Sequence, residues 1–347
     1  MSKLRDQVWT WYQQGELKPE QMPKALALAA EAEPAVAWRE TIEQLLLWLG
    51  VLFIGAGVII FFAFNWQDLD KFGKFALVQA LLLACMLAYA GLRWREREQN
   101  PAGMGPSKAN ACLLGLSLMI GALLALVGQT YQTGADPWQL FAIWSLCLVP
   151  LALLGGFDLL WLKLLALVNL SMALYFHTWP QAWGWFDADV FTLVFISAFN
   201  GLLYIGLLAA QHYQWQRLHA PICQSLSILV AMVTLTVYGC WQALEISASS
   251  SFVYYFVYAC AVFALARWVL HQLLPLALVC FSAIAVSTVW LGVNMLDSFD
   301  EFGVFFFIAM YIVMATAAVS VWLTKIRAQW LPLQPKEDDE EGEANGV

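Results

Sequence analysis

Residues 43–64 read EQLLLWLGVLFIGAGVIIFFAF, and this stretch decides the fold class. A membrane-spanning helix needs about 20 consecutive, mostly apolar residues, and barrel strands would instead be short and alternating. Nine further segments of this kind follow, at residues 75–92, 110–131, 138–157, 159–176, 190–210, 222–243, 252–270, 273–296 and 302–323. The sequence therefore predicts an all-α protein, a polytopic bundle of about ten transmembrane helices.

The composition of the whole chain agrees with this prediction. Of the 347 residues, 61% are hydrophobic and only 12% are charged, whereas average soluble domains are about half apolar and a quarter charged. No basic patch with interleaved aromatic residues is present, so we expect no nucleic-acid partner. The first apolar run begins near Leu45, beyond the first 30 or so residues where a cleavable signal peptide would lie. We therefore expect no cleavable signal.

The distribution of Lys and Arg orients the bundle, because cytoplasmic loops are enriched in these residues. With ten spans and a cytoplasmic N-terminus, the opposite side holds only Lys71 and Lys74, whereas Lys163 can snorkel back to the cytoplasmic end of its span. The other basic residues on the cytoplasmic side are Lys3, Arg5, Lys18, Lys24, Arg39, Arg93, Arg95, Arg97, Lys108, Arg217, Arg267, Lys325, Arg327 and Lys336. The outer side is acidic, with Asp68, Asp70, Asp136, Asp187, Asp189, Glu245, Asp297, Asp300 and Glu301. Both termini are predicted to be cytoplasmic.

Three regions follow from these patterns. Residues 1–41 are predicted to form a short cytoplasmic helical hairpin, with helices at 3–14 and from Pro19 to about Ala32. Residues 42–324 form the transmembrane bundle, in which the long run 252–296 is divided at Arg267, His271 and Pro275. Residues 325–347 are predicted to be a disordered cytoplasmic tail, because this segment is strongly acidic.

No catalytic or metal-binding pattern accompanies the spans. The seven cysteines lie in apolar runs without CxxC spacing and are interpreted as packing residues. His177 with Asp187 and Asp189 lacks the spacing of a metal site, and no Gly-rich phosphate loop or nucleophile elbow is present. We therefore expect that the protein is not an enzyme and uses no cofactor or metal.

Polar residues within apolar spans are the first candidates for function, because unpaired polar groups are costly in hydrocarbon. They are Asn65, Gln79, Gln129, Thr130, Asn169, Asn200, Gln242 and Asn294. The simpler interpretation of the amides is hydrogen bonding between helices. Asp158, at a turn after two glycines, is interpreted as the cap of the fifth span.

Two outer stretches carry an unusual density of polar and aromatic residues. They are FNWQD at 64–68 and VGQTYQTGADPWQ at 127–139, and Asp136 with Pro137 fits the start of the fourth span. The first and third spans both carry Gly and Ala stripes that allow close helix packing. We predict an outward-facing recess where these two spans meet, with helix capping as the alternative explanation of the motif. Its candidate residues are Asn65, Trp66, Gln129, Thr130, Tyr131, Gln132, Asp136 and Trp138.

The segments FIGAGVIIFFAFNW (53–66) and GQTYQTGADPWQLF (128–141), together with the N-terminal hairpin, resemble the predicted bacterial membrane proteins that share the domain of unknown function 2157. The resemblance covers residues 4–141. It implies a bacterial inner-membrane protein and no particular activity. It also implies a partner, a second small membrane protein carrying a GDYxxLxY-like motif.

Three functions are compatible with these features. The first is a non-enzymatic component of an envelope or membrane complex, surrounded by membrane lipids and using the outer face or the cytoplasmic hairpin to meet its partner. The alternative is a small-molecule or ion transporter with a five-plus-five inverted repeat. A membrane enzyme acting on a lipid-linked substrate ranks last, because the nine outer acids are scattered.

Overall fold

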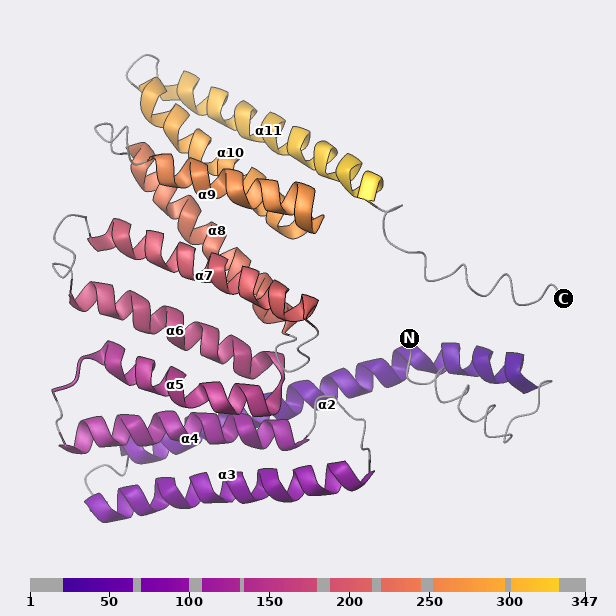
Figure 1. The fold of residues 1–347 in the computed structure, drawn as a ribbon, viewed down its shortest axis with the longest axis vertical. Coiled ribbons are helices and arrows are strands. Elements are labelled where there is room, and N and C mark those ends of the chain that lie inside the picture. Colours follow the sequence, from indigo (N-terminus) through magenta and orange to yellow (C-terminus); the bar gives the residue numbers. More distant parts are fainter. Residues whose placement is uncertain are drawn as a thin grey trace. The chain divides into compact units, whose positions relative to one another are not determined.

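The computed structural model describes residues 21–64, 70–99, 108–131, 134–179, 188–213, 220–244, 252–296 and 301–330, and these residues form helices and no strand (Figure 1). Ten of the helices are long and apolar enough to cross a membrane. Their spans are Ile42–Phe61, Lys71–Glu96, Lys108–Tyr131, Pro137–Gly155, Asp158–Thr178, Val190–His212, Pro221–Leu244, Phe252–Leu270, Leu273–Met295 and Gly303–Trp330. The all-α, multi-pass architecture predicted from the sequence is confirmed.

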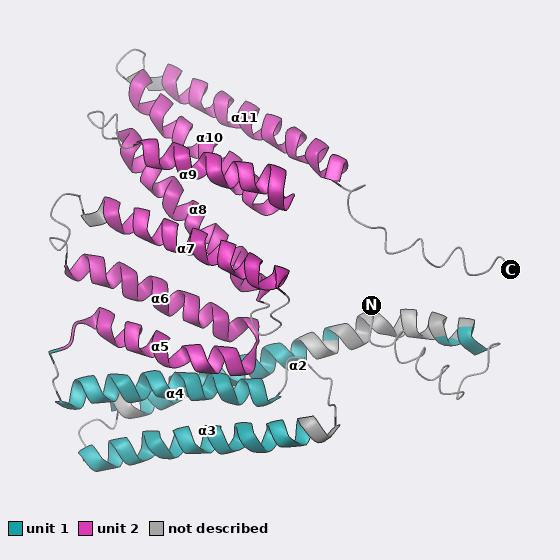
Figure 2. Cartoon of the chain, in the orientation of Figure 1, with its two compact units in different colours: residues 1–134 teal, residues 135–347 magenta. Residues whose placement is uncertain are grey.

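The chain divides into two compact units, Met1–Gly134 and Ala135–Val347 (Figure 2). Unit 1 contains the helices α2 (Met22–Phe64), α3 (Lys71–Gln99) and α4 (Lys108–Tyr131). In this unit α4 packs along both α2 and α3. The first helix of the predicted hairpin and the acidic tail beyond residue 330 lie outside the described residues.

Helix α2 runs without a break through the boundary predicted at residues 41 and 42. The second hairpin helix, expected to end at about Ala32, continues into the first span as one helix of 43 residues. The segment between them reads EPAVAWRET at 33–41 and has Pro34 as its only helix breaker, with no glycine. Helices commonly end at a glycine, so without one the chain continues across Pro34 into the span.

The predicted packing of the first span on the third is confirmed. Gly55 of α2 faces Leu118 of α4 so closely that a Cβ on Gly55 would lie 2.8 Å from the Leu118 side chain. Nearer the C-terminal end of α2, Val58 packs with Val78 of α3 and Leu126 of α4. Glycine at position 55 therefore allows the two backbones to approach.

Unit 2 contains α5 (Pro137–Gly155), α6 (Asp158–Thr178), α7 (Ala188–His212), α8 (Pro221–Leu244), α9 (Phe252–Ala264), the π-helical turn η3 (Leu265–Leu270), α10 (Leu273–Leu296) and α11 (Glu301–Trp330). The pairs α5–α6, α7–α8, α8–α10 and α10–α11 pack along one another. Helix α8 is central, and its residues Ile228, Met232 and Leu235 are fully buried in the main apolar cluster.

The predicted division of the run 252–296 is also confirmed. After α9 the chain forms the turn η3, and His271 then adopts a left-handed conformation with φ 51°. The next helix begins at Leu273. A π-helical turn followed by a left-handed residue ends one helix and lets the chain reverse into the next.

Candidate functional site

The amides of Asn169 and Asn200 pair with each other across α6 and α7. Asn200 Nδ2 donates to Asn169 Oδ1 over 2.6 Å, and Asn169 Nδ2 donates to Asn200 Oδ1 over 3.2 Å. Each amide also donates to the carbonyl four residues earlier, Leu165 or Ile196, over 2.8 Å. Both amide groups therefore have all their donors satisfied inside the bundle, which agrees with their interpretation as links between helices.

Hydroxyl groups make similar links among α8, α9, α10 and α11. Thr236 Oγ1 donates to Ser282 Oγ over 2.8 Å, and Ser282 Oγ lies 3.1 Å from the hydroxyl of Tyr255. Further along α10, Ser287 Oγ lies 2.6 Å from the hydroxyl of Tyr311. These hydroxyl groups are hydrogen-bonded to one another and link the four helices.

Two glycines hold tyrosine rings of α9 against the neighbouring helices, a feature that the sequence reasoning missed. A Cβ on Gly201 of α7 would collide with the hydroxyl of Tyr258, which donates to the Ser197 carbonyl over 3.0 Å. A Cβ on Gly239 of α8 would lie 2.9 Å from the ring of Tyr255. The signal available in the sequence was a cluster of tyrosines in one span, two glycines in a second span and one glycine in a third.

The residues predicted to form the recess belong to both units, and their surroundings are described for each unit separately. In unit 1, α4 ends at Tyr131, so Gln129, Thr130 and Tyr131 occupy its last turn. Gln129 and Tyr131 are exposed, and the Tyr131 ring lies 5.9 Å from that of Phe75 on α3. Thr130 Oγ1 is buried and has no hydrogen-bond partner among the described residues. Asn65, Trp66 and Gln132 lie outside the described residues.

Lys74 was not among the predicted recess residues, but it lies one position from Phe75 and is only 7% exposed. Its helix, α3, begins at Lys71, where Asp70 Oδ1 accepts a hydrogen bond from the Gly73 amide over 2.9 Å. Lysine is seldom buried to this degree in proteins. The end of α3 near Tyr131 therefore contains a buried cation as well as a capping carboxylate.

In unit 2, Asp136 occupies the N-cap position of α5 with Pro137 next to it, as predicted. However, its side chain makes no capping bond to the helix. Instead, Asp136 Oδ2 accepts a hydrogen bond from Trp179 Nε1 over 3.3 Å. Trp138 packs edge-on against Tyr175 at 5.0 Å, and its indole nitrogen is buried without a partner among the described residues. Asp136 thus joins the start of α5 to the end of α6, and the recess as a whole stays a prediction.

Two residues near the predicted cytoplasmic ends of α5 and α6 differ from expectation. Phe157, and not Asp158, occupies the N-cap of α6. Asp158 lies in the first turn, where its negative charge interacts favourably with the dipole of the helix. Lys163 Nζ lies 4.6 Å from the centroid of the Trp144 ring on α5, eleven residues before the end of that helix. Its ammonium therefore makes a cation–π contact inside the span instead of snorkelling to its end.

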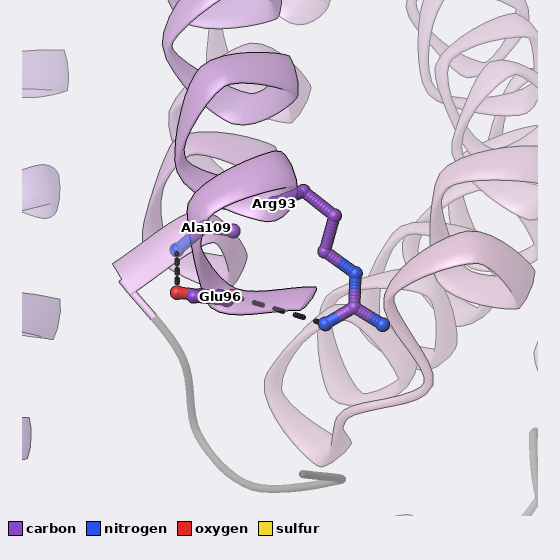
Figure 3. Close-up of polar contacts among 3 residues, drawn as sticks. All are labelled: Arg93, Glu96 and Ala109. Carbon is purple, nitrogen blue, oxygen red and sulfur yellow. Dashed lines mark hydrogen bonds and ion pairs between the residues drawn. The ribbon is translucent and has the colours of Figure 1, made fainter. Parts of the chain in front are cut away.

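A carboxylate from α3 caps the start of α4 (Figure 3). Glu96 Oε1 accepts a hydrogen bond from the Ala109 amide over 3.2 Å, and Glu96 Oε2 lies 3.8 Å from an Arg93 guanidinium nitrogen. The first amides of a helix lack intrahelical partners and carry a partial positive charge. Glu96 therefore fixes the ends of α3 and α4 together within unit 1.

No group of three His, Cys, Asp or Glu side chains comes together as a metal site in the part of the chain that the structure describes. The seven cysteines are free. His177 is exposed at the end of α6, and the side chains of Asp187 and Asp189 lie outside the described set. The described spans therefore contain interhelical polar links and apolar packing.

No curated protein and no solved structure shows significant similarity to the chain. The resemblance noted in the sequence covers residues 4–141, and a family comparison matches nearly the same part of the chain. Residues 9–161 match the model of the family described as predicted membrane protein (DUF2157). This match confirms the resemblance over these residues and agrees with the ten helices that are long and apolar enough to cross a membrane.

Proposed function

We propose that the chain is a non-enzymatic component of a complex in a bacterial inner membrane, and that α2 binds one transmembrane helix of a second membrane protein. The proposal rests on the geometry of α2. At 1.5 Å per residue its 43 residues extend about 65 Å, roughly twice the 30 Å hydrocarbon core of a bilayer. The span Ile42–Phe61 occupies the core, and the preceding 20 residues extend beyond it.

The membrane part of α2 packs within unit 1 along a single face. Val51, Gly55 and Val58 lie on this face and approach α4. Gly50 and Gly57 are seven residues apart and lie about a third of a turn away from it. No atom among the described residues lies within 4 Å of the position that a Cβ would take on either glycine. Within unit 1 the two glycines therefore leave open space, which a second helix can fill.

Large apolar side chains flank these two glycines. Phe53 and Ile54 are 67% and 68% exposed. Small residues between large ones allow close helix packing, which is what drives association in lipid. A polar or charged surface would be expected for a partner in water, so the apolar side chains favour a partner inside the membrane.

The transporter alternative receives less support. A five-plus-five inverted repeat would place five spans in each half, whereas the two compact units contain three and seven of the ten described spans. The paired amides Asn169 and Asn200 also leave no open donor in the middle of α6 and α7. We therefore favour the complex component.

Substitution at Gly57 tests this proposal. The Gly57→Leu variant should fill the open face without disturbing α4, and Gly206→Leu is a matched control because the space beside Gly206 of α7 is also open. The full-length chain would be extracted from its native membranes into lipid nanodiscs, and the mass of the resulting particle measured by native mass spectrometry. The wild-type chain and the control should carry a second polypeptide, identified by its mass, that Gly57→Leu lacks.

Two outcomes would contradict the proposal. The first is retention of the second polypeptide by Gly57→Leu in a folded state. The second is a wild-type particle that contains this chain alone. If the second polypeptide is another copy of this chain, the α2 face serves self-association and the heteromeric complex is excluded.

A further inference from the structure

A groove in unit 2 lies between α9 and α11, with α10 as its floor. Its volume is about 740 Å³. Phe252 and Phe256 of α9, Trp290 of α10, and Tyr311 and Val319 of α11 contribute to its walls. The groove is open along one side, so in a membrane it opens toward the hydrocarbon. Small-molecule sites have volumes of about 300–1,000 Å³ and are mostly apolar.

The hydroxyl groups that line the groove are hydrogen-bonded within the protein. The hydroxyls of Tyr255 and Tyr311 lie within hydrogen-bonding distance of Ser282 and Ser287. Ser287 Oγ also lies 2.6 Å from the Ala283 carbonyl of its own helix. Because these hydroxyl groups bond within the protein, a polar ligand would lose its hydration in this groove and gain few new partners, and this loss is costly. The chemistry of the walls therefore favours an entirely apolar occupant.

The groove is about one leaflet deep. On α10 it extends from Cys280 to Trp290, a rise of about 15 Å at 1.5 Å per residue. This equals half of the roughly 30 Å hydrocarbon core. At its inner end, one turn beyond Val319, the rings of Phe263 and Trp322 stack at 6.0 Å with their planes 8° apart. On α10 the groove lies around the middle of the span Leu273–Met295, and it is closed on the side where that span begins and opens toward the end of α10.

Small side chains keep the groove open. Ala283 of α10 and Ala315 and Ala318 of α11 line it. At the closed end α9 and α11 touch through Phe263 and Trp322, whereas beyond this contact the three alanines leave the space between the two helices unfilled. A larger side chain at one of these positions would fill the space directly.

The dimensions exclude the larger occupants. A transmembrane helix is about 10 Å wide and about 30 Å long, which is twice the length of the groove. A stable dimer buries about 800 Å² on each partner, more than a groove 15 Å long provides. A single hydrocarbon chain has the required length and chemistry.

We propose that this groove binds one acyl chain of a phospholipid from the leaflet on the side where α10 ends, which is the outer leaflet in the predicted orientation. The chain lies along α10 with its terminal methyl group near Phe263 and Trp322. The headgroup lies beyond Trp290, at the membrane interface where α10 ends and α9 begins at Phe252. The bound lipid completes the packing of α9 against α11.

The test compares Ala315→Phe, which fills the groove, with Ala317→Phe, which adds the same ring to an exposed position of α11 outside the groove. The full-length protein is reconstituted in nanodiscs of phosphatidylethanolamine and phosphatidylglycerol and then released in a mild detergent. Native mass spectrometry counts the retained phospholipids. The wild-type chain and Ala317→Phe should retain one more phospholipid than Ala315→Phe.

A phospholipid with a diazirine near the end of one acyl chain gives the second measurement. After irradiation, its adducts should map to groove residues such as Phe256 and Val319 in the wild-type chain and should be lost in Ala315→Phe. Ala283→Leu fills the groove from α10 and replaces Ala315→Phe if the latter does not fold. Equal lipid retention in a folded groove-filling variant, or adducts spread evenly over the exposed faces of α11, would overturn the proposal. So would a dimer of the wild-type chain that the groove-filling variant dissociates.

Discussion

Asn169 and Asn200 form a closed amide pair in which Asn200 Nδ2 lies 2.6 Å from Asn169 Oδ1 and the reverse bond is 3.2 Å long. Asn200 is completely buried. Replacement of Asn169 by leucine leaves one donor and one acceptor of Asn200 without partners, and we expect a loss of about 1–3 kcal/mol of stability. Unfolding of the purified protein in detergent micelles measures this loss.

The double variant Asn169→Leu/Asn200→Leu is the internal control for this prediction. Because both partners are then apolar, it should be more stable than Asn169→Leu alone. The exposed residue Asn294 bonds only to its own helix, at the Trp290 carbonyl, so Asn294→Leu should leave stability unchanged. A single variant as stable as the wild type would show that the pair is not a link between the helices.

Gly201 of α7 has no room for a side chain beside the Tyr258 hydroxyl. The Gly201→Ala variant should lose about 1–3 kcal/mol, the usual cost of overpacking a core. Removal of that hydroxyl in Gly201→Ala/Tyr258→Phe should recover part of the loss. Thermal unfolding of the two variants provides the comparison.

Gly206, on the same helix, gives the matched control for this substitution. Because the space beside it is open, Gly206→Ala should be neutral or should stabilise the helix by up to about 1 kcal/mol. A Gly201→Ala variant that behaves like Gly206→Ala would contradict the close packing of α9 on α7.

The predicted orientation leads to a test at the C-terminal end of α11. Green fluorescent protein fused after Arg327 should fluoresce, and alkaline phosphatase fused at the same position should be inactive, because the Lys and Arg distribution places this end in the cytoplasm. Fusions within the connection between α4 and α5 should behave in the opposite way. Active phosphatase after Arg327 would reverse the orientation of every span.

The unit 1 part of the recess can be tested by labelling. Tyr131 is 66% exposed, so a cysteine at this position, in a chain whose native Cys240 is replaced by alanine, should react with a membrane-impermeant thiol reagent added from outside. Ser117→Cys, at a fully buried position of the same helix, should not react. Reaction of the Tyr131→Cys variant only after permeabilisation would place the recess on the other side.

A binding assay distinguishes the two explanations of the polar motif, a recess that binds a partner or ligand and a purely structural helix cap. Gln129 is exposed, so Gln129→Leu should leave the folded state intact. If the recess binds a partner or ligand, this variant should lose association with the second polypeptide, which native mass spectrometry detects. Unchanged association would leave only a structural role for this motif.

Hydropathy alone predicted the spans because their length is imposed by the membrane. The division of the run 252–296 followed from Arg267, His271 and Pro275, and the structure places the reversal at His271. Hydropathy does not specify which faces of the helices meet. Asn169 and Asn200 lie at similar depths, 11 residues after the start of α6 and 12 before the end of α7, but their pairing also requires α6 and α7 to be neighbours.

Local chemistry also led to errors where two explanations competed. Asp158 follows two glycines, as a capping residue often does, but Phe157 takes the N-cap position and the carboxylate lies in the first turn. The hairpin was expected to end near Ala32, but the segment that follows contains no glycine and continues the helix. Asp136 occupies its predicted position, yet its bond to Trp179 could not be anticipated because the two residues are far apart in the sequence.

Helix α2 connects the membrane to the region before it as one continuous helix. Pro34 lacks an amide hydrogen, so the helix bends most easily at this residue. The 20 residues that precede the span reach about 30 Å, so a tilt of roughly 10° within the bilayer moves their far end by about 5 Å if the helix stays straight. Pro34 therefore decides how much of a change in the tilt of the span reaches the N-terminal end of this helix.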